Sequence, residues 1–258
     1  MKRIFMFAAT ALMTVSCLVD GPSSSPVDAD KLHRYAMDKL VGYVDVPVEA
    51  LELALEFERY LSLPESEKES NMLFYGNIKK LDETKYQMMI DYSDFSDEYR
   101  IVECRLDTKG VSLWSEGASW IIESFSIYGN DFGYSYRDYS FVMEENVSLM
   151  NLSVADSTWV LPLDEDNVTR MKMRPMRDDL YEWVVEAQGT ETTSLDVKAE
   201  FGTAGEFIVR ERKVYFGVTS NVHSGRFNMS IYRGGQPYDY CNMIFVPGMM
   251  SETVTSRD

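Results

Sequence analysis

Histidine and cysteine are scarce in this sequence, and their scarcity excludes several kinds of site. Only two histidines, His33 and His223, and three cysteines occur among the 258 residues. A zinc site needs about four ligands at short spacing, mostly His and Cys, and the sequence contains no such group. We therefore expect no metal and no other cofactor. We interpret both histidines as incidental surface residues, His33 on a helix and His223 in a hairpin turn.

Recognisable catalytic motifs are also missing. The sequence has neither the Gly-x-Ser-x-Gly turn of a serine hydrolase nor a glycine-rich phosphate-binding loop. Among 42 acidic residues some pair of carboxylates will always be spaced as glycoside hydrolysis requires, so such a pair carries no information. We therefore predict no catalytic residues.

Positive charge is in short supply. The chain has 25 basic residues against 42 acidic ones, a formal charge of −17. Nucleic-acid binding depends largely on Lys and Arg that contact phosphates, and docking on anionic lipid head groups depends on the same residues. The charge therefore argues against nucleic acid as a partner and against docking on lipid head groups.

The one long apolar run is too short to span a membrane. It covers 12 residues, from Ile4 to Val15, whereas a membrane-spanning helix needs about 20. Lys2 and Arg3 precede the run, and Cys17 follows it after a small residue. This order of basic, apolar and small residues is typical of an export signal.

Residues 1–17 resemble the signal segment of a bacterial lipoprotein, similar to those of Bacteroidota. The resemblance implies that residues 1–16 are removed as a signal peptide and that Cys17 is lipidated, so that an N-terminal lipid anchor holds the protein to the membrane. Leu18 follows the cysteine where an inner-membrane lipoprotein has Asp, which implies an outer-membrane protein facing the periplasm or the cell surface. The alternatives are a secreted protein cleaved elsewhere and a short anchor helix.

Removal of the signal makes the chain more acidic. Without Lys2 and Arg3, 23 basic residues remain against 42 acidic ones, a formal charge of −19. Residues 17–27 contain the lipidated cysteine and a segment rich in Gly, Pro and Ser, which we interpret as a flexible tether. We expect a single β-rich domain over residues 28–246 and a loose C-terminal tail over residues 247–258.

Only residues 28–63 carry a strong helical pattern. Apolar residues recur at steps of three and four over positions 32–43 and again over positions 51–61. Asp45, Pro47 and Glu49 form an arrangement typical of a helix start. The sequence therefore predicts two helices, near 28–43 and 47–62, that meet at a short break.

From Leu73 to Val246 the apolar residues alternate with polar ones, as Tyr181 and Trp183 do with Glu182. Such alternation is typical of antiparallel sheet with one buried face. Turn-type residues separate the apolar runs at positions 107–110, 129–131, 164–167, 223–225 and 234–235. The pattern predicts a mainly β (α+β) fold of about a dozen strands. In it, an N-terminal helix pair packs on a large antiparallel sheet, arranged as a sandwich or a partly closed barrel.

The two cysteines that remain after Cys17 are expected in the core. Cys104 and Cys241 each share the apolar face of a predicted strand. Two interpretations stand: separate buried thiols that act as small apolar residues, which we favour, or a disulfide.

The densest aromatic stretch is the candidate ligand site. A sugar-binding platform needs flat rings beside hydrogen-bonding groups, and this stretch has both, although cross-strand packing explains the same residues without a ligand. The candidate residues are Tyr128, Phe132, Tyr134, Tyr136, Arg137 and Tyr139. A smaller group contains Tyr232, Arg233, Gln236, Tyr238 and Tyr240.

Together these features predict a lipid-anchored, non-catalytic binding or interaction protein of the cell envelope, whose partner is a glycan or another envelope protein. The alternatives are an envelope hydrolase such as a glycosidase and a lipocalin-like carrier of an apolar small molecule. Two convergent carboxylates in a groove would favour the hydrolase. A closed sheet around an apolar cavity would favour the carrier.

Overall fold

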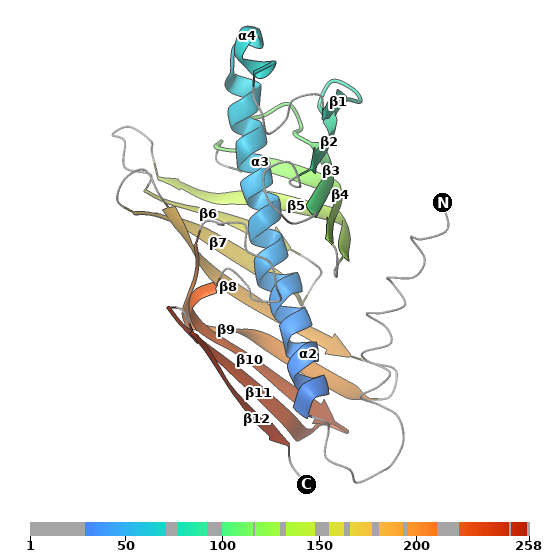
Figure 1. Ribbon diagram of the computed structural model, residues 1–258, viewed down its shortest axis with the longest axis vertical. Coiled ribbons are helices and arrows are strands. Elements are labelled where there is room, and N and C mark those ends of the chain that lie inside the picture. Colours follow the sequence, from blue (N-terminus) through green and yellow to red (C-terminus); the bar gives the residue numbers. More distant parts are fainter. Residues whose placement is uncertain are drawn as a thin grey trace.

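One long helix lies along the concave side of one large antiparallel sheet (Figure 1). The structure is a computed structural model, and it describes residues 29–70, 77–91, 100–115, 117–129, 133–147, 155–162, 166–176, 181–192, 196–210, 222–247 and 249–256.

The helical region is continuous. Helix α2 (Ala29–Leu40), a π-helical segment η1 (Val41–Asp45) and helix α3 (Val46–Ser62) follow one another directly. At 1.5 Å per residue they form one helix about 50 Å long, so the predicted break between two helices is absent. A short helix, α4 (Glu65–Lys68), follows. No helix in the described part of the chain combines the length and the apolarity that a membrane crossing requires.

Burial explains why the helix does not break at Pro47. Every residue from position 44 to position 51 is buried, so the helix is enclosed on all sides there. A break would leave backbone N–H and C=O groups without partners and without water. Instead, the Val46 N–H donates to the Val41 carbonyl five residues back, which gives the wider turn of a π-helix.

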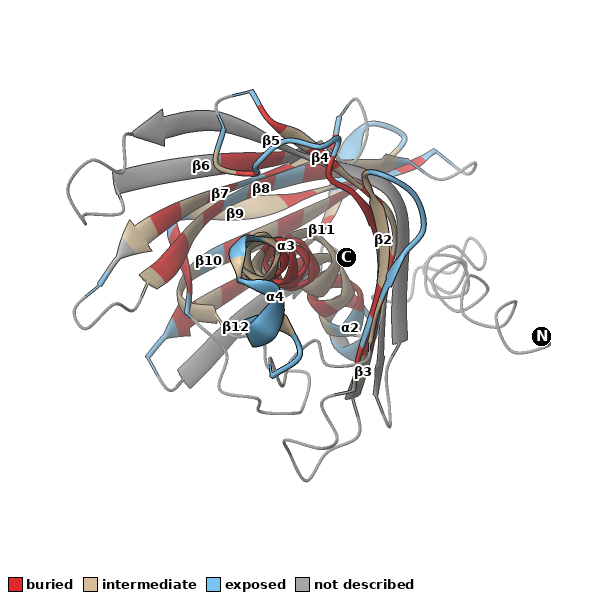
Figure 2. Ribbon diagram, turned by 90° about the horizontal axis from the view of Figure 1, so that it is seen from above, coloured by how far each residue is buried: buried red, intermediate tan, exposed pale blue. Residues whose placement is uncertain are grey.

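Within the described ranges the sheet contains twelve strands, each paired with the next one in the sequence. They are β1 (Ile78–Lys80), β2 (Lys85–Asp91), β3 (Arg100–Asp107), β4 (Ser119–Gly129), β5 (Gly133–Val147), β6 (Ala155–Pro162), β7 (Val168–Pro175), β8 (Tyr181–Thr192), β9 (Val197–Arg210), β10 (Val222–Arg233), β11 (Gln236–Val246) and β12 (Met249–Ser256). Strands β1 and β12 are the edges of this open sheet. Its two ends curve toward each other around the helix, in a sandwich-like arrangement (Figure 2). The predicted mainly β fold is confirmed.

Side chains from the helix and the concave face of the sheet form the core. Trp120, Trp159 and Trp183 are fully buried. The centre of the Trp159 ring lies 5.3 Å from the centre of the Trp114 ring and 5.8 Å from that of the Trp183 ring. Both pairs are in edge-to-face contact. Such pairs are favourable beyond the apolar area that they bury. The concave side of the sheet is thus occupied by the helix and by large aromatic side chains.

Two local predictions were wrong. Residues 249–256 form strand β12, which pairs with β11 along its whole length, rather than a loose tail. The pairing gives these backbone groups hydrogen-bond partners that a tail would lack. Residues 223–225, predicted as a turn, lie within β10. Gly225 has a positive φ of 141° there, which glycine tolerates inside an irregular strand as well as in a turn.

Candidate functional site

The predicted aromatic site spans two neighbouring strands. The backbone places five of its residues as follows: Tyr128 in β4, and Tyr134, Tyr136, Arg137 and Tyr139 in β5. The register pairs Tyr136 with Phe125 and Tyr139 with Ile122, and both of these partners are buried. Phe132 and the side chains of the other five candidates lie outside the described residues. The aromatic platform therefore stays a prediction.

A different site lies on the convex face, where strand β9 is irregular. Between Val184 and Gln188, three residues of β8 stand opposite five residues of β9. Strand β9 therefore carries a bulge with two extra residues. Because two residues are one full period of a strand, the side chains before and after the bulge keep their faces. Phe201 before the bulge and Val209 after it both remain buried.

Thr203 replaces part of the backbone pairing that the bulge removes. The Ala187 N–H donates to Thr203 Oγ1 at 3.0 Å, and this hydroxyl lies 3.5 Å from the Ala187 carbonyl oxygen. Gly202 permits the close approach of the two strands, because a Cβ there would lie 2.5 Å from the same carbonyl oxygen. The strands are therefore held together beside the bulge.

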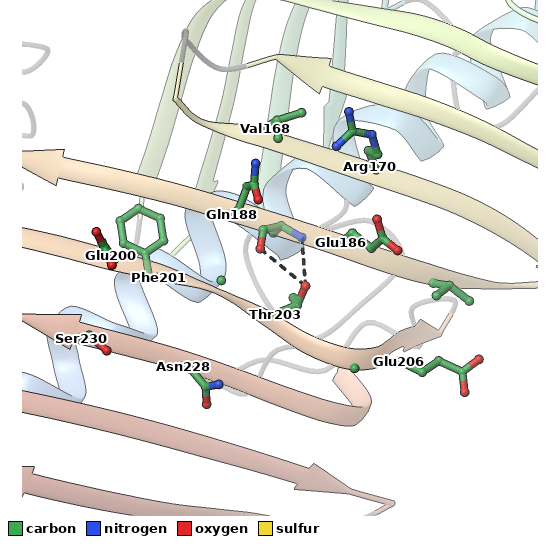
Figure 3. A pocket seen from close by; sticks show the side chains of 14 residues that line it. Val168, Arg170, Glu186, Gln188, Glu200, Phe201, Thr203, Glu206, Asn228 and Ser230 are labelled. Atoms are coloured by element: carbon green, nitrogen blue, oxygen red, sulfur yellow. Dashed lines mark hydrogen bonds between the residues drawn. The ribbon is translucent and has the colours of Figure 1, made fainter.

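A groove of about 800 Å³ lies over the bulge (Figure 3). Along each strand, the side chains that line the groove alternate with side chains that are buried in the core. Because the core lies on the concave side of the sheet, the groove opens on the convex face. The polar residues that line it are Arg170 of β7, Glu186 and Gln188 of β8, Glu200, Thr203 and Glu206 of β9, and Asn228 and Ser230 of β10. Amide, hydroxyl, carboxylate and guanidinium groups together supply both donors and acceptors. The groove is therefore suited to a polar ligand.

Two of the glutamates in the groove are paired with cations. Glu200 lies 2.6 Å from Lys198 Nζ, and the hydrogen bond from this lysine lowers the pKa of Glu200. Glu206 is paired with Arg174. Because Glu200 is ionised at neutral pH, it accepts hydrogen bonds in the groove but has no proton to give to a substrate.

A charged network closes one end of the groove. Glu182 is buried and accepts hydrogen bonds from Nε of Arg174 at 2.6 Å and from Nε of Arg210 at 3.1 Å. Burial would raise the pKa of Glu182, but the bonds from both arginines outweigh it and lower that pKa. Burial and the charge of Arg210 lower the pKa of His223. Since Arg174 also binds Glu206, the network fixes β7, β8 and β9 to one another.

Two residues of the smaller aromatic group support the groove: a hydrogen bond from Tyr232 helps to lower the pKa of Glu200, and Tyr240 contacts Asn228. The Tyr240 hydroxyl, on β11, donates to Asn228 Oδ1 at 3.2 Å. This bond orients the Asn228 amide at the edge of the groove. In the same group, the Arg233 guanidinium lies 5.0 Å from the centre of the Tyr238 ring, a cation–π contact.

The two core cysteines are separate buried thiols. Cys104 in β3 and Cys241 in β11 are buried and form no disulfide, as the favoured interpretation predicted. Burial raises the pKa of the Cys104 thiol, which makes it unreactive. Cys17 lies outside the described residues. Within those residues, no cluster of three or more His, Cys, Asp or Glu side chains is arranged to hold a metal ion.

The convex groove was not predicted, although the sequence carries a weak signal for it. Gly202 and Gly205 interrupt the alternating pattern of residues 197–209, and glycine inside a strand indicates a bulge or a close approach. The polar residues of the groove are spread from Arg170 to Ser230. No local motif joins them, because only strand pairing brings them together.

Comparison with protein-family models, with curated proteins and with solved structures found no match. Function is therefore inferred from the site and from the signal segment alone.

Proposed function

We propose that this protein is a lipid-anchored binding protein of the cell envelope and that it holds a polar ligand, preferably a glycan, in the convex groove over β7–β10. The observation that carries the proposal is the β9 bulge, because it opens a groove of about 800 Å³ lined by polar side chains from four strands. The signal segment that ends at Cys17 supports the envelope location.

The lining of the groove favours hydroxyl groups as the chemistry that it recognises. A sugar hydroxyl both donates and accepts, and so do the amides of Gln188 and Asn228 and the hydroxyls of Thr203 and Ser230. Carboxylates and arginine add charge-assisted hydrogen bonds, which are the stronger kind. Phe201, the one aromatic residue of the lining, is buried. Recognition here would therefore rest on hydrogen bonds rather than on ring stacking.

The two alternatives have less support. A glycosidase needs one protonated and one ionised carboxyl group placed on either side of the bond to be cleaved. Two of the three glutamates in the groove are held by cations: Glu200, which is ionised, by Lys198, and Glu206 by Arg174. A carrier of apolar molecules needs space inside the sheet, and the described helix and aromatic side chains occupy the concave side.

Binding of the full-length protein to a glycan array tests the proposal. The double variant Glu186→Ala/Gln188→Ala removes two exposed groups of the groove. It should weaken binding of the best glycan about tenfold or more, which is about 1.4 kcal/mol. The matched control is Glu103→Ala/Arg105→Ala, two exposed residues with the same spacing on β3.

A third variant separates the groove from the site predicted earlier. Tyr134→Ala/Tyr136→Ala alters the aromatic platform and should leave binding unchanged if the groove is the site. Loss of binding in this variant alone, with an unchanged melting temperature, would assign the ligand to the platform instead. Release of new reducing ends from the bound glycan would support the hydrolase.

A further inference from the structure

A second hollow adjoins the groove on the other side of the bulge. It has a volume of about 400 Å³ and is lined by residues of β9, β10 and β11: Ala204, Gly205, Glu206, Gly225, Arg226, Ile244 and Phe245. Gly205 and Glu206 line both hollows. The two hollows therefore meet at the bulge.

The same two extra residues open both hollows. On the β10 side, one residue, Gly225, stands opposite three residues of β9. At the bulge, β9 therefore has two extra residues relative to β10 as well as relative to β8. Only glycine fits at position 225, because the Phe207 ring occupies the space where a side chain would lie. A Cβ there would lie 2.5 Å from Phe207 Cδ2. Phe207 thus turns into the core while Glu206, before it, stays exposed.

The hollows lie in a row across the strands. They extend from Arg170 on β7 to Ile244 on β11, which is four strand spacings of about 4.8 Å, or about 19 Å. Strands β7 to β11 are all paired on both sides. A peptide cannot be added to them as a further strand, because that mode needs a sheet edge. The direction and length of the row instead match a linear chain that crosses the sheet surface.

We propose that the two hollows form one binding groove for a linear, hydroxyl-rich oligosaccharide that crosses β7–β11. This inference rests on the proposed function and extends it. The amides and hydroxyls of the first hollow bind one end of the chain. In the second hollow, Arg226 is exposed and forms no ion pair within the described part of the chain. Its guanidinium donates to hydroxyl or ring oxygens at the other end.

Affinity as a function of chain length tests this inference. The probes are cello-, xylo-, manno- and malto-oligosaccharides, each from the monosaccharide to the hexasaccharide, and the protein is the full chain. In the series that binds, affinity should rise with length and level off once the chain fills both hollows. Arg226→Ala should weaken the longest chain about tenfold and leave the shortest bound chain unaffected. Arg105→Ala, an exposed arginine on β3, is the matched control.

The outcomes separate the two proposals. If Glu186→Ala/Gln188→Ala weakens binding but chain length and Arg226→Ala have no effect, the second hollow is not used, and the inference fails while the proposed function stands. If no series binds, the inference fails, and the proposed function fails with it if the glycan array also finds no ligand. Melting temperatures of the variants within the error of the wild type exclude loss of fold, and Arg226→Lys, which keeps a donor, should recover part of the affinity.

Discussion

Pro47 lies inside a buried, continuous helix, where proline normally costs about 3 kcal/mol or more. It has no N–H to offer the Tyr43 carbonyl one turn earlier. The sheet supplies the missing donor, because the fully buried Thr169 of β7 donates its hydroxyl to this carbonyl at 2.7 Å. The Tyr43 ring, in turn, packs edge-on against Phe201 at 4.6 Å. The proline is therefore tolerated where helix and sheet fit together.

Replacing Thr169 with valine tests this contact. Thr169→Val keeps the shape of the side chain but removes the hydroxyl, and a buried carbonyl that loses its donor costs about 1–3 kcal/mol. We expect the free energy of unfolding to fall by that amount in urea denaturation. Thr192→Val, the same change at an exposed position of β8, should alter it by less than about 0.5 kcal/mol.

A double-mutant cycle identifies the cause. In a Pro47→Ala background the helix can supply its own N–H to the Tyr43 carbonyl, so Thr169→Val should cost less there. An equal loss in both backgrounds would mean that Thr169 stabilises the fold by some contact other than this one.

At the scale of elements, polar contacts fix the helix against the sheet at several points along its length. At α2, the Tyr35 hydroxyl donates to Glu191 at 2.5 Å, and Lys39 Nζ lies 2.6 Å from the same carboxylate. Farther along, the Trp183 indole N–H donates to Glu52 at 2.8 Å. Each contact joins the helix to β8, which is next to the irregular strand β9. The helix therefore supports the strands that carry the groove.

The contact at Glu191 makes stability depend on pH. Burial would raise the pKa of Glu191, but the hydrogen bonds from Lys39 and Tyr35 outweigh it and lower that pKa. A carboxyl group with a lowered folded pKa stabilises the protein fully above its unfolded pKa, near 4.5. That contribution is lost as the pH falls through the folded value. Burial raises the pKa of Asp38 beside it, which acts in the opposite sense.

Glu191→Gln tests this prediction. The variant should be less stable than the wild type at about pH 7, and the difference should shrink toward about pH 2, where both side chains are neutral. Urea midpoints at a series of pH values measure it. Both proteins carry Asp38→Asn as well, because the charge of Glu191 also raises the pKa of Asp38. A difference that stays constant across the range would contradict the pH argument. Glu83→Gln, at an exposed turn, is the control.

At the scale of the whole molecule, the predicted lipid anchor would join the described helix and sheet to a membrane. The described helix begins at Ala29, close to the end of the predicted tether of residues 18–27, which reaches about 35 Å when fully extended. A tether of that length would hold the groove clear of the bilayer. The acidic chain, with a formal charge of −19 after removal of the signal, would add no attraction to anionic head groups, so membrane attachment would depend on the lipid on Cys17.

Cys17→Ser tests the anchor in the native host. The wild-type protein should be found in the membrane fraction and be released only by detergent, because several acyl chains bind far more strongly than one. The variant should leave that fraction. Intact-mass measurement should find the wild type cleaved before Cys17 and carrying lipid. An unmodified thiol at Cys17, or a retained leader sequence, would refute the anchor.

The sequence by itself determined the class of the fold, because local chemistry encodes it. A strand with one solvent-exposed face and one buried face alternates polar and apolar residues, as Tyr181, Glu182 and Trp183 do. This alternation located the strands. The helical periodicity of residues 32–61 located the helix. The apolar faces of Cys104 and Cys241 predicted their burial for the same reason.

Only the tertiary structure decided what depends on contacts between distant residues. The helix stays continuous at Pro47 because the sheet encloses it and Thr169 supplies a hydrogen bond. Residues 249–256 become a strand because β11 offers them an edge. The convex groove exists because two extra residues in β9 have no partners in β8 and β10. This interruption of the strand pairing arises only when the three strands lie side by side, so the sequence does not reveal it.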